Sequence, residues 1–479
     1  MLGYIILGII VVLLLVILFR TLAFKPKAEG EKTFEEISFD KEAAISALAE
    51  LIKCKTVSDY DPAKEDNAEF EKLVNMLPSL YPNVFKVCTL EKLPDRALLF
   101  RWKGQNDPSG DPCVLMAHYD VVPVEEENWA KPAFDAIIED GVMWGRGTLD
   151  TKVTFNGILS AAENLIKQGF TPKDDIYFAF SGQEEVNGPG AIRNVEWFKA
   201  HGITPSMVVD EGGAVVEGVF PGVAGPCGLI GIAEKGMMNL KFDLESDGGH
   251  ASSPAPHTPV GRLSAACVKL ENHPFPKHFT KPVLAMFDTL GRHSTFVYRM
   301  IFANLWCFGG ILDMICKKSG GELNALVRTT VAYTMMDGSK APNVIPPKAS
   351  MVANLRLNPE DSIESAMQYV KSVIGDDDIK LSHYASMEPS PISSIDCEGW
   401  RRVVNAVEGT WKGCLVSPYL MVQCSDSRHY GDISDKVYRF SAMDLTAEER
   451  HSIHGNNEKI RLETAGRAVE FFIRIMKQC

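Results

Sequence analysis

Short apolar runs of strand type alternate with helical segments over the first half of the chain. The runs are ALLFRW (97–102), CVLMAH (113–118), IYFAFS (176–181) and SMVVD (206–210), and a helical run follows Asp150. This alternation predicts an α/β fold, a mixed sheet with helices on both faces. In such sheets ligands bind outside the carboxyl ends of the strands. The pattern therefore also predicts where a functional site lies.

Ionisable side chains stand at the ends of these apolar runs. His118 and Asp120 are two residues apart at the end of the second run, so both lie on one face. Glu184 and Glu185 follow the third run side by side, and adjacent carboxylates repel unless solvent or a cation separates them. Taken singly, each group has an ordinary structural explanation.

Further acidic and histidine residues repeat the pattern. Asp150 follows a glycine-rich turn and precedes a helix, where N-capping would be a sufficient role. Asp210 and Glu211 end the fourth run, and His451 and His454 precede a C-terminal helix. Imidazole and carboxylate groups without thiolate are typical of a catalytic zinc site. The surplus of carboxylates favours two metal ions that share a ligand.

Nine motifs in order then suggest a family. They are MAHYDVVP, WGRGTLDTK, EEVNGPGA, VVDEGG, EKGMMNL, GGHASSP, NVIPP, SDSRHY and IHGNNEK. Together they resemble the zinc-dependent aminoacylase/carboxypeptidase metallopeptidase family, most closely its carboxypeptidase S and N-fatty-acyl-amino-acid hydrolase branch. The resemblance runs from about residue 40 to 475. It implies a zinc exopeptidase-like catalytic domain with an inserted α+β lid and dimerisation domain.

The resemblance also implies a metal site. The cofactor would be two Zn²⁺ ions, or another divalent cation such as Co²⁺ or Mn²⁺. The expected ligands are His118, Asp150 as the bridge, Glu185, Asp210 and His454. For the fifth ligand Asp210 is preferred to Glu211, although either acid would serve.

Three further residues would act on the reaction by the same resemblance. Asp120 would hold His118 in one tautomer. Glu184 would be the general base, taking a proton from the water between the metals and passing one to the leaving amine. His250 of GGHASSP would reach an active site from the lid and polarise the scissile carbonyl.

Substrate binding is expected from polar residues of the second half of the chain. Asn343 and Arg356 occupy positions of substrate-binding polar groups in the family. Arg428 of SDSRHY is preferred for gripping a free carboxylate, since a guanidinium matches it bidentately. The alternative for both arginines is an ordinary ion pair. The chain departs from the family pattern at Thr151 and Gln183, where aspartates are frequent.

The N-terminus carries the uncharged apolar run GYIILGIIVVLLLVILF (3–19), close to the length that crosses a bilayer. A retained single-pass anchor is preferred to a cleaved signal peptide, because no basic segment precedes the run and no clear cleavage site follows it. Arg20, Lys25 and Lys27 follow the run and weakly favour a cytoplasmic body.

A second apolar stretch, VYRMIFANLWCFGGILDMIC (297–316), could be another membrane span. Arg299, Asp313 and two glycines interrupt it, which favours buried helices or a partly exposed apolar surface. The predicted organisation is a transmembrane anchor (1–24), a linker (25–39), a catalytic domain in two parts (40–234 and 386–479) and the inserted lid/dimerisation domain (235–385).

Composition limits the partners. The net charge is −13, which argues against nucleic acid, because phosphate binding needs clustered Lys and Arg. The expected partners are a small-molecule substrate, the membrane through the N-terminal helix, and a second copy in a homodimer through the lid domain.

We expect a membrane-anchored zinc amidohydrolase. It would cleave a peptide or N-acyl bond next to an amino acid with a free carboxylate, and the apolar segment 276–325 favours long acyl chains. One alternative is a metallo-carboxypeptidase or dipeptidase that acts on short peptides. Another is a catalytically inactive membrane-anchored binding protein, although the ligands and the base are all present.

Overall fold

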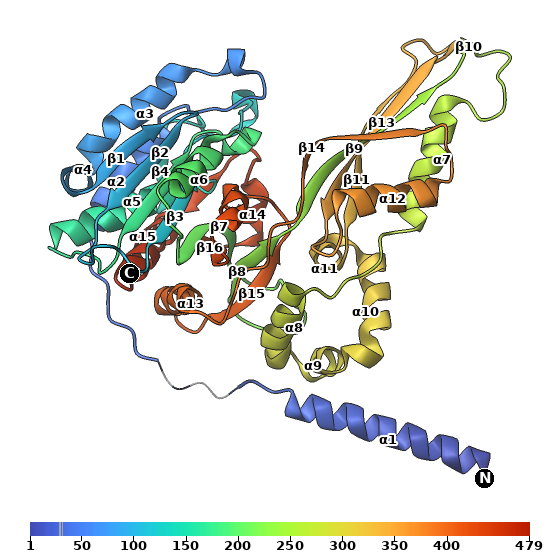
Figure 1. Ribbon diagram of the computed structural model, residues 1–479, viewed down its shortest axis with the longest axis horizontal. Helices are drawn as coiled ribbons and strands as arrows, with labels where there is room; N and C mark the ends of the chain where they lie inside the picture. The colour runs from blue at the N-terminus through green and yellow to red at the C-terminus, as the bar shows by residue number, and fades with distance from the viewer. Residues whose placement is uncertain (28–29, 31) are drawn as a thin grey trace.

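An eight-stranded sheet forms the centre of the protein, in a computed structural model that describes residues 1–27, 30 and 32–479 (Figure 1). The strand order is β1-β2-β6-β3-β7-β16-β8-β15. The bounds are Thr89–Leu93 (β1), Ala97–Trp102 (β2), Cys113–His118 (β3), Ile176–Ser181 (β6), Met207–Val216 (β7), Cys227–Glu234 (β8), Leu415–Met421 (β15) and Val437–Leu445 (β16). Strands β6, β3, β7 and β16 are parallel, whereas β2 pairs antiparallel with β6 and β16 antiparallel with β8. The predicted α/β class with a mixed sheet is confirmed.

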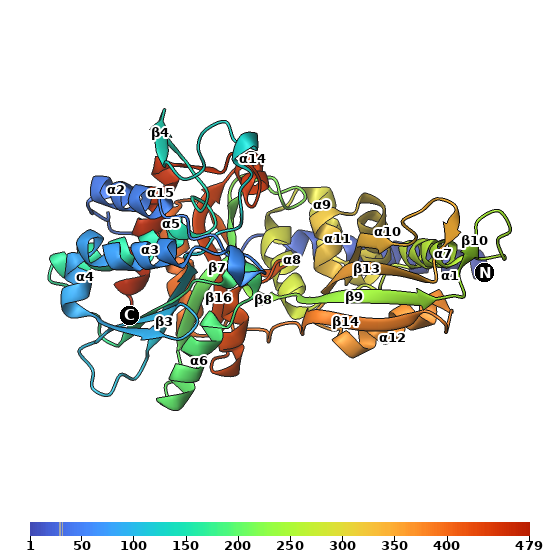
Figure 2. The ribbon, with the colours of Figure 1, turned by 90° about the horizontal axis from the view of Figure 1, so that it is seen from above.

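Helices cover both faces of this sheet (Figure 2). One face carries α2 (Lys41–Ile52), α5 (Lys152–Lys167) and α15 (Leu462–Met476), and the other carries α6 (Gly190–Ala200). Along β3, Leu115 belongs to the core under α5, whereas Val114 and Met116 belong to the core under α6. The whole strand is buried because its apolar side chains alternate between two covered faces.

The remaining helices of this part of the chain lie around the sheet. Their bounds are Asn67–Leu80 (α3), Pro82–Val87 (α4), Glu398–Thr410 (α13) and Ala447–Ser452 (α14). A small sheet of β4 (Ile137–Glu139), β5 (Val142–Trp144) and β17 (Lys459–Arg461) has the order β17-β5-β4. It holds the segment before α15 beside the turn that precedes Asp150.

Between β8 and α13 the chain forms a further region, here called the inserted unit. Its antiparallel sheet has the order β11-β13-β9-β14, with bounds Gly236–Glu245 (β9), Thr330–Asp337 (β11), Lys348–Leu357 (β13) and Lys380–Met387 (β14). Helices α7 (Pro259–Asn272) and α12 (Ile363–Ile374) share a core with one face of it. Every second residue of β9 is buried, as expected for a sheet covered on one side. The short strands β10 (Gly249–His250) and β12 (Val344–Ile345) pair near the far tip.

Four helices connect α7 to β11 within the inserted unit: α8 (Lys281–His293), α9 (Phe296–Ala303), α10 (Leu305–Ser319) and α11 (Gly321–Val327). The second apolar stretch of the sequence is α9 and α10, which meet at an angle of 114°. It is therefore no straight span, and part of its apolar surface is exposed.

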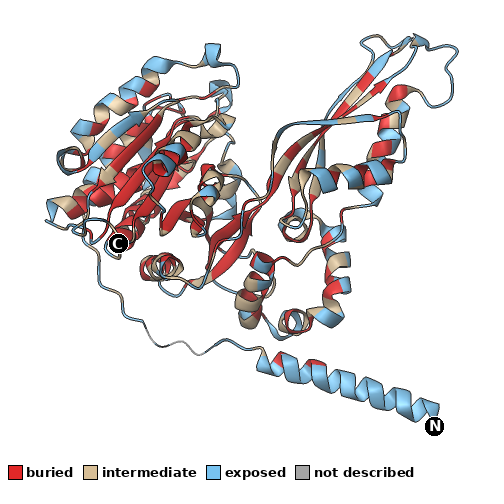
Figure 3. Ribbon diagram, in the orientation of Figure 1, coloured by how far each residue is buried: buried red, intermediate tan, exposed pale blue. Residues whose placement is uncertain are grey.

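Helix α1 (Leu2–Ala23) extends from the body and is exposed along nearly all of its length (Figure 3). Only Ile17 and Thr21 are buried. The helix is long and apolar enough to cross a membrane, and a signal sequence at the N-terminus has the same properties. The linker predicted at 25–39 includes residues 28, 29 and 31, which lie outside the described residues.

Candidate metal centre and active site

His118 ends β3 at the carboxyl edge of the central sheet, where only 2% of its surface is exposed. Its Nε2 lies 3.0 Å from Asp150 Oδ1 and 3.4 Å from Glu211 Oε1. One ring nitrogen thus faces two carboxylates that come from different parts of the chain. Strand order, rather than sequence proximity, brings these groups together.

His454 approaches the same aspartate from the other side. Its Nε2 lies 3.0 Å from Asp150 Oδ2 and 3.1 Å from Glu185 Oε2. Asp150 therefore directs one carboxylate oxygen toward each histidine. The ligand atoms of His118, Asp150 and Glu185 lie within 4.8 Å of one another, and so do those of His118, Glu184 and Glu211.

The two acids considered for the fifth ligand, Asp210 and Glu211, have different surroundings. Asp210 Oδ2 accepts the backbone N–H of Ser427 at 2.9 Å and is directed away from His118, whereas Glu211 contacts His118. Neighbouring residues on β7 point to opposite faces, so only one of the two acids faces the cluster. The geometry thus favours Glu211 in place of Asp210.

Asp120 is fully buried and holds two parts of the cluster together. Its Oδ1 lies 3.4 Å from His118 Nδ1. Its two oxygens accept the backbone N–H groups of Glu184 and Glu185, each at 3.1 Å. Asp120 thus contacts the His118 ring, most closely through its backbone carbonyl at 3.1 Å, and its carboxylate fixes the turn that carries the glutamates.

Glu458 is a positioning residue that sequence reasoning missed. It is fully buried, and its carboxylate accepts from the Arg146 guanidinium at 2.7 Å and from the backbone N–H groups of Leu149 (2.6 Å) and Asp150 (3.2 Å). These contacts hold the turn that ends in the bridging aspartate. Its place in the IHGNNEK motif was visible, but its partners, some 310 positions away, were not.

Burial and charge work against each other inside the cluster. Burial lowers the pKa of His118, but the carboxylates of Glu211, Asp120 and Asp150 outweigh it and hold that pKa well above its ordinary value. Hydrogen bonds to Asp150 and Glu185 raise the pKa of His454 to about 10. Concentrated negative charge of this kind attracts a cation.

Burial is the main influence on the pKa values of two further carboxyls of the cluster, Glu184 and Glu211. Burial raises the pKa of Glu184 well above its ordinary value, against the opposing charge of His118. Burial likewise raises the pKa of Glu211 to about 8. A carboxyl whose pKa is raised in this way is suited to accept and return a proton near neutral pH.

The inserted unit does not bring its predicted residues to this cluster. His250 and Asn343 lie at β10 and beside β12, at the tip of the inserted unit far from β3 and β7 in both views (Figures 1 and 2). His250 is exposed, and the backbone N–H of Ala251 donates to the carbonyl of Asn343 at 3.0 Å. Within this chain, in this arrangement, neither residue meets the metal cluster.

The two predicted arginines have different surroundings. Arg428 forms an ion pair with the buried Glu234, with Arg428 Nη2 2.9 Å from Glu234 Oε2. This is the alternative role that the sequence analysis gave for both arginines. Arg356 donates to Asn354 Oδ1 and to Cys424 Sγ, both at 3.2 Å, and among the described residues no carboxylate forms an ion pair with it. Because Cys424 lines the cleft of the metal cluster, Arg356 is the better placed of the two to meet a substrate carboxylate.

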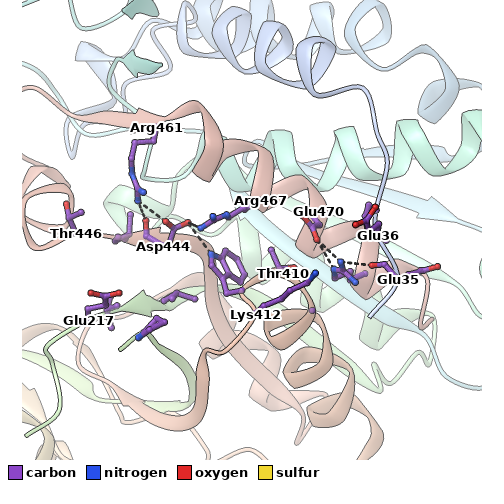
Figure 4. Close-up of a pocket in the computed structure, with 18 of the residues that line it drawn as sticks. Glu35, Glu36, Glu217, Thr410, Lys412, Asp444, Thr446, Arg461, Arg467 and Glu470 are labelled. Carbon is purple, nitrogen blue, oxygen red and sulfur yellow. Dashed lines mark hydrogen bonds and ion pairs between the residues drawn. The ribbon is translucent and has the colours of Figure 1, made fainter. Parts of the chain in front are cut away.

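A cleft of about 400 Å³ opens on the cluster. Its walls combine Asp150, Glu184, Glu211 and His454 with apolar side chains from β7, β8, β15 and β16. A larger cavity of about 900 Å³ lies elsewhere, between the residues around Glu35 and α15 (Figure 4). Four of its charged groups form ion pairs, Arg461 with Asp444 and Arg474 with Glu470. The candidate ligands Asp150, Glu211 and His454 line the smaller cleft.

Comparison with known proteins places the chain in one family. The sequence model of Peptidase family M20/M25/M40 matches residues 114–478. Probable carboxypeptidase S-like 2 of Dictyostelium discoideum is 33% identical over 90% of this chain and 84% of its own length. N-fatty-acyl-amino acid synthase/hydrolase PM20D1 of Xenopus tropicalis is 34% identical over 91% of this chain and 86% of its own length.

Solved structures agree on the fold. The M20 family metallo-carboxypeptidase Sso-CP2 from Sulfolobus solfataricus superposes with a TM-score of 0.67 at 15% identity, covering 91% of this chain and 98% of that one. Human carnosine dipeptidase 1 gives a TM-score of 0.62 at 14% identity, covering 91% and 97%. The resemblance read from the nine motifs is confirmed: the chain belongs to the peptidase family M20/M25/M40 and is a hydrolytic enzyme that acts on amide bonds.

Proposed function

We propose that the protein is a dinuclear zinc amidohydrolase that cleaves N-acyl amino acids. The observation that carries the proposal is the placement of Asp150 between two histidines, with one carboxylate oxygen directed toward each. One metal would be held by His118, Asp150 and Glu211, and the other by His454, Asp150 and Glu185. A bridging carboxylate between two imidazole sites is the donor arrangement of two-metal hydrolases.

The residues present fit such a pair of ions. Glu185 Oε1 is buried and has no hydrogen-bond partner among the described residues, as expected of an oxygen that would bind a cation. Imidazole with carboxylate suits Zn²⁺, and Co²⁺ or Mn²⁺ would be accepted by the same donors. When bound, the metals supply Lewis-acid polarisation of the scissile carbonyl and lower the pKa of water.

Glu184 is the proposed general base. It would take a proton from the attacking water and return one to the leaving amine, which balances the hydrolysis into a carboxylic acid and an amino acid. Asp120 supports this role because it fixes the backbone of Glu184 and the ring of His118 at once. Burial raises the pKa of Glu184, which strengthens it as a proton acceptor relative to an exposed carboxylate.

The proposed substrate has an apolar acyl group and a free carboxylate. The acyl group would lie along the apolar wall of the cleft, which includes Leu229, Met421 and Met443. The carboxylate would be bound by Arg356 beside Cys424. Two of the relatives carry names that specify N-fatty-acyl amino acids and carboxypeptidase action, and both reactions use a substrate with a free carboxylate.

The inserted unit would act as a lid and carry His250 and Asn343 to an active site. The distance of the tip from the cluster requires either a closing movement or a second copy of the chain. A homodimer through the inserted unit would satisfy the requirement without a large rearrangement. We further propose that α1 remains attached as a single-pass membrane anchor, a role supported by its length and its apolar surface.

The test combines metal content and hydrolysis for the wild type and Glu184→Gln. We expect about two zinc ions per chain in both proteins, and a rate reduced by about 10²–10⁴-fold in the variant, the usual contribution of a general base. A wild-type protein that binds no metal, or that binds zinc but hydrolyses no N-acyl amino acid and no peptide, would favour the inactive binding protein instead.

A second assay separates the two hydrolytic alternatives. The wild type is given N-acetyl and N-oleoyl amino acids beside a panel of dipeptides, and release of the free amino acid is measured. The apolar wall of the cleft predicts the highest kcat/KM for the long-chain acyl substrate. Faster release from the dipeptides would assign the protein as a carboxypeptidase or dipeptidase.

A further inference from the structure

Exposed apolar side chains gather on three helices of the inserted unit. Outside residues 1–24, the described chain has eighteen large apolar residues that are exposed, and eight of them fall between positions 284 and 315. We call these eight the apolar surface: Leu284, Phe296, Val297, Tyr298, Trp306, Ile311, Met314 and Ile315. Soluble proteins seldom leave so many large apolar groups together unless something covers them.

Helix α10 shows that this exposure is organised. Gly309, Leu312 and Cys316 face the body and are buried, as one side of an amphipathic helix should be. The outward side is also apolar, with Trp306 58% exposed and Met314 62% exposed. A surface helix in contact with water would carry polar groups on that side, so a medium other than water is indicated.

The apolar surface continues into α1 through a specific junction. The fully buried Asn304, at the bend between α9 and α10, donates its side-chain amide to the carbonyl of Ile17 at 3.3 Å and to Thr21 Oγ1 at 3.2 Å. Arg20 donates to the carbonyl of Ala303 at 2.9 Å. These hydrogen bonds attach the C-terminal end of α1 to the bend between α9 and α10. Helices α9 and α10 therefore lie next to the point where α1 leaves the body (Figure 1).

The charges around this region suit a lipid surface. Residues 281–319 contain five Lys and Arg against two Asp, whereas the whole chain has a net charge of −13. Both aspartates are engaged, Asp288 by Arg292 and Asp313 by Arg328. Lys317 and Lys318 are exposed at the end of α10. Lys317 also pairs with Asp313 at 3.1 Å, so anionic headgroups would meet Lys318 first.

We propose that the apolar surface of α8–α10 inserts into the interfacial layer of a membrane beside α1. The proposal rests on the proposed retention of α1 as an anchor, and it adds a second contact that fixes the orientation of the body on the bilayer. Trp306 and Tyr298 lie at the level of the headgroups, where aromatic side chains are favoured, and the lysines of α10 contact lipid phosphates.

Cys307 offers a native site for the test, because it alone among the cysteines is exposed and it neighbours Trp306. The full chain is labelled there with an environment-sensitive fluorophore and placed in nanodiscs of phosphatidylcholine and phosphatidylserine, with or without spin labels near the headgroup end of the acyl chains. The matched control carries the label at an exposed position of α3, in Cys307→Ser/Glu71→Cys. Cys307→Ser alone reports background labelling.

We expect blue-shifted emission at Cys307 and quenching by the lipid spin label that is several-fold stronger than at the control position. Equal, weak quenching at the two positions would overturn the proposal. Blue-shifted emission without lipid quenching would also overturn it, since a second copy of the chain would then cover the surface.

A charged variant of the surface provides the second measurement. Trp306→Asp/Ile315→Asp should reduce quenching at Cys307 to the control level while hydrolysis of a soluble N-acyl amino acid in detergent stays unchanged. Unchanged quenching in this variant would contradict the proposal. Absence of hydrolysis in the wild type would contradict the proposed enzymatic function. It would not change what the quenching says about the contact of the apolar surface with lipid.

Discussion

Polar residues differ in burial and hydrogen bonding between the edge of the central sheet and the tip of the inserted unit. At the sheet edge His118 and Asp120 are buried, and several hydrogen bonds fix their positions. At the tip His250 is exposed on a two-residue strand. Under the proposed function, the ligands at the sheet edge stand in a preformed frame, whereas a group that acts only on bound substrate can be delivered by movement or by a second chain.

The largest effect is expected from the bridging ligand. Asp150→Ala removes the one carboxylate that faces both histidines, so both metals should be lost and hydrolysis should fall to the assay background. Metal content by mass spectrometry and thermal unfolding check the result. An active variant with one metal per chain would show that the two sites are independent.

The tip should contribute less, and in a different parameter. His250→Ala removes one donor to the scissile carbonyl, so kcat should fall by about 10²–10³-fold with the metal content unchanged. Mixing His250→Ala with Glu184→Gln then sharpens the comparison. Recovered activity in the mixture means that a second copy supplies the histidine, and its absence means that the tip closes on its own chain.

Two arginines test the contact between the two regions: Arg356 on β13 of the inserted unit and Arg428 between β15 and β16 of the central sheet. Arg356→Gln should raise KM by about 10- to 100-fold, the value of a charge-assisted hydrogen bond to the substrate carboxylate. Arg428→Gln should instead lower the free energy of unfolding, because Glu234 loses one of its buried cationic partners. Steady-state kinetics and denaturant unfolding separate them, and the reverse pattern would restore the original preference for Arg428.

The last expected effect, about tenfold per pH unit, is the pH dependence of metal binding. In the metal-free site the pKa of His454 is raised to about 10 and that of His118 also lies well above its ordinary value, so at pH 6.5 a metal must displace a proton from each histidine. The affinity for zinc should therefore rise with pH by about tenfold per unit for each released proton. Titration calorimetry at pH 6.5 and 8.5 measures it, and equal affinities would show that neither histidine releases a proton when the metal binds.

Much of the secondary structure around the site could be predicted from the local sequence pattern. The strand runs and the helix after Asp150 appear in the structure, because periodicity depends on neighbouring residues. The choice between Asp210 and Glu211 could not be made this way. It depends on which face of β7 meets His118, and that follows from the pairing of distant strands.

The sequence by itself determined the α/β class and the family, and it predicted most of the acidic and histidine groups of the candidate metal cluster, since these follow from motifs and residue chemistry that are read directly along the chain. Only the tertiary structure decided that Glu458 supports Asp150 and that Glu234 engages Arg428. It also decided that His250 stands far from the cluster and that α10 leaves an apolar side exposed beside α1. The physical reason is that burial and pairing arise between segments hundreds of residues apart, through packing that no single stretch of the sequence contains.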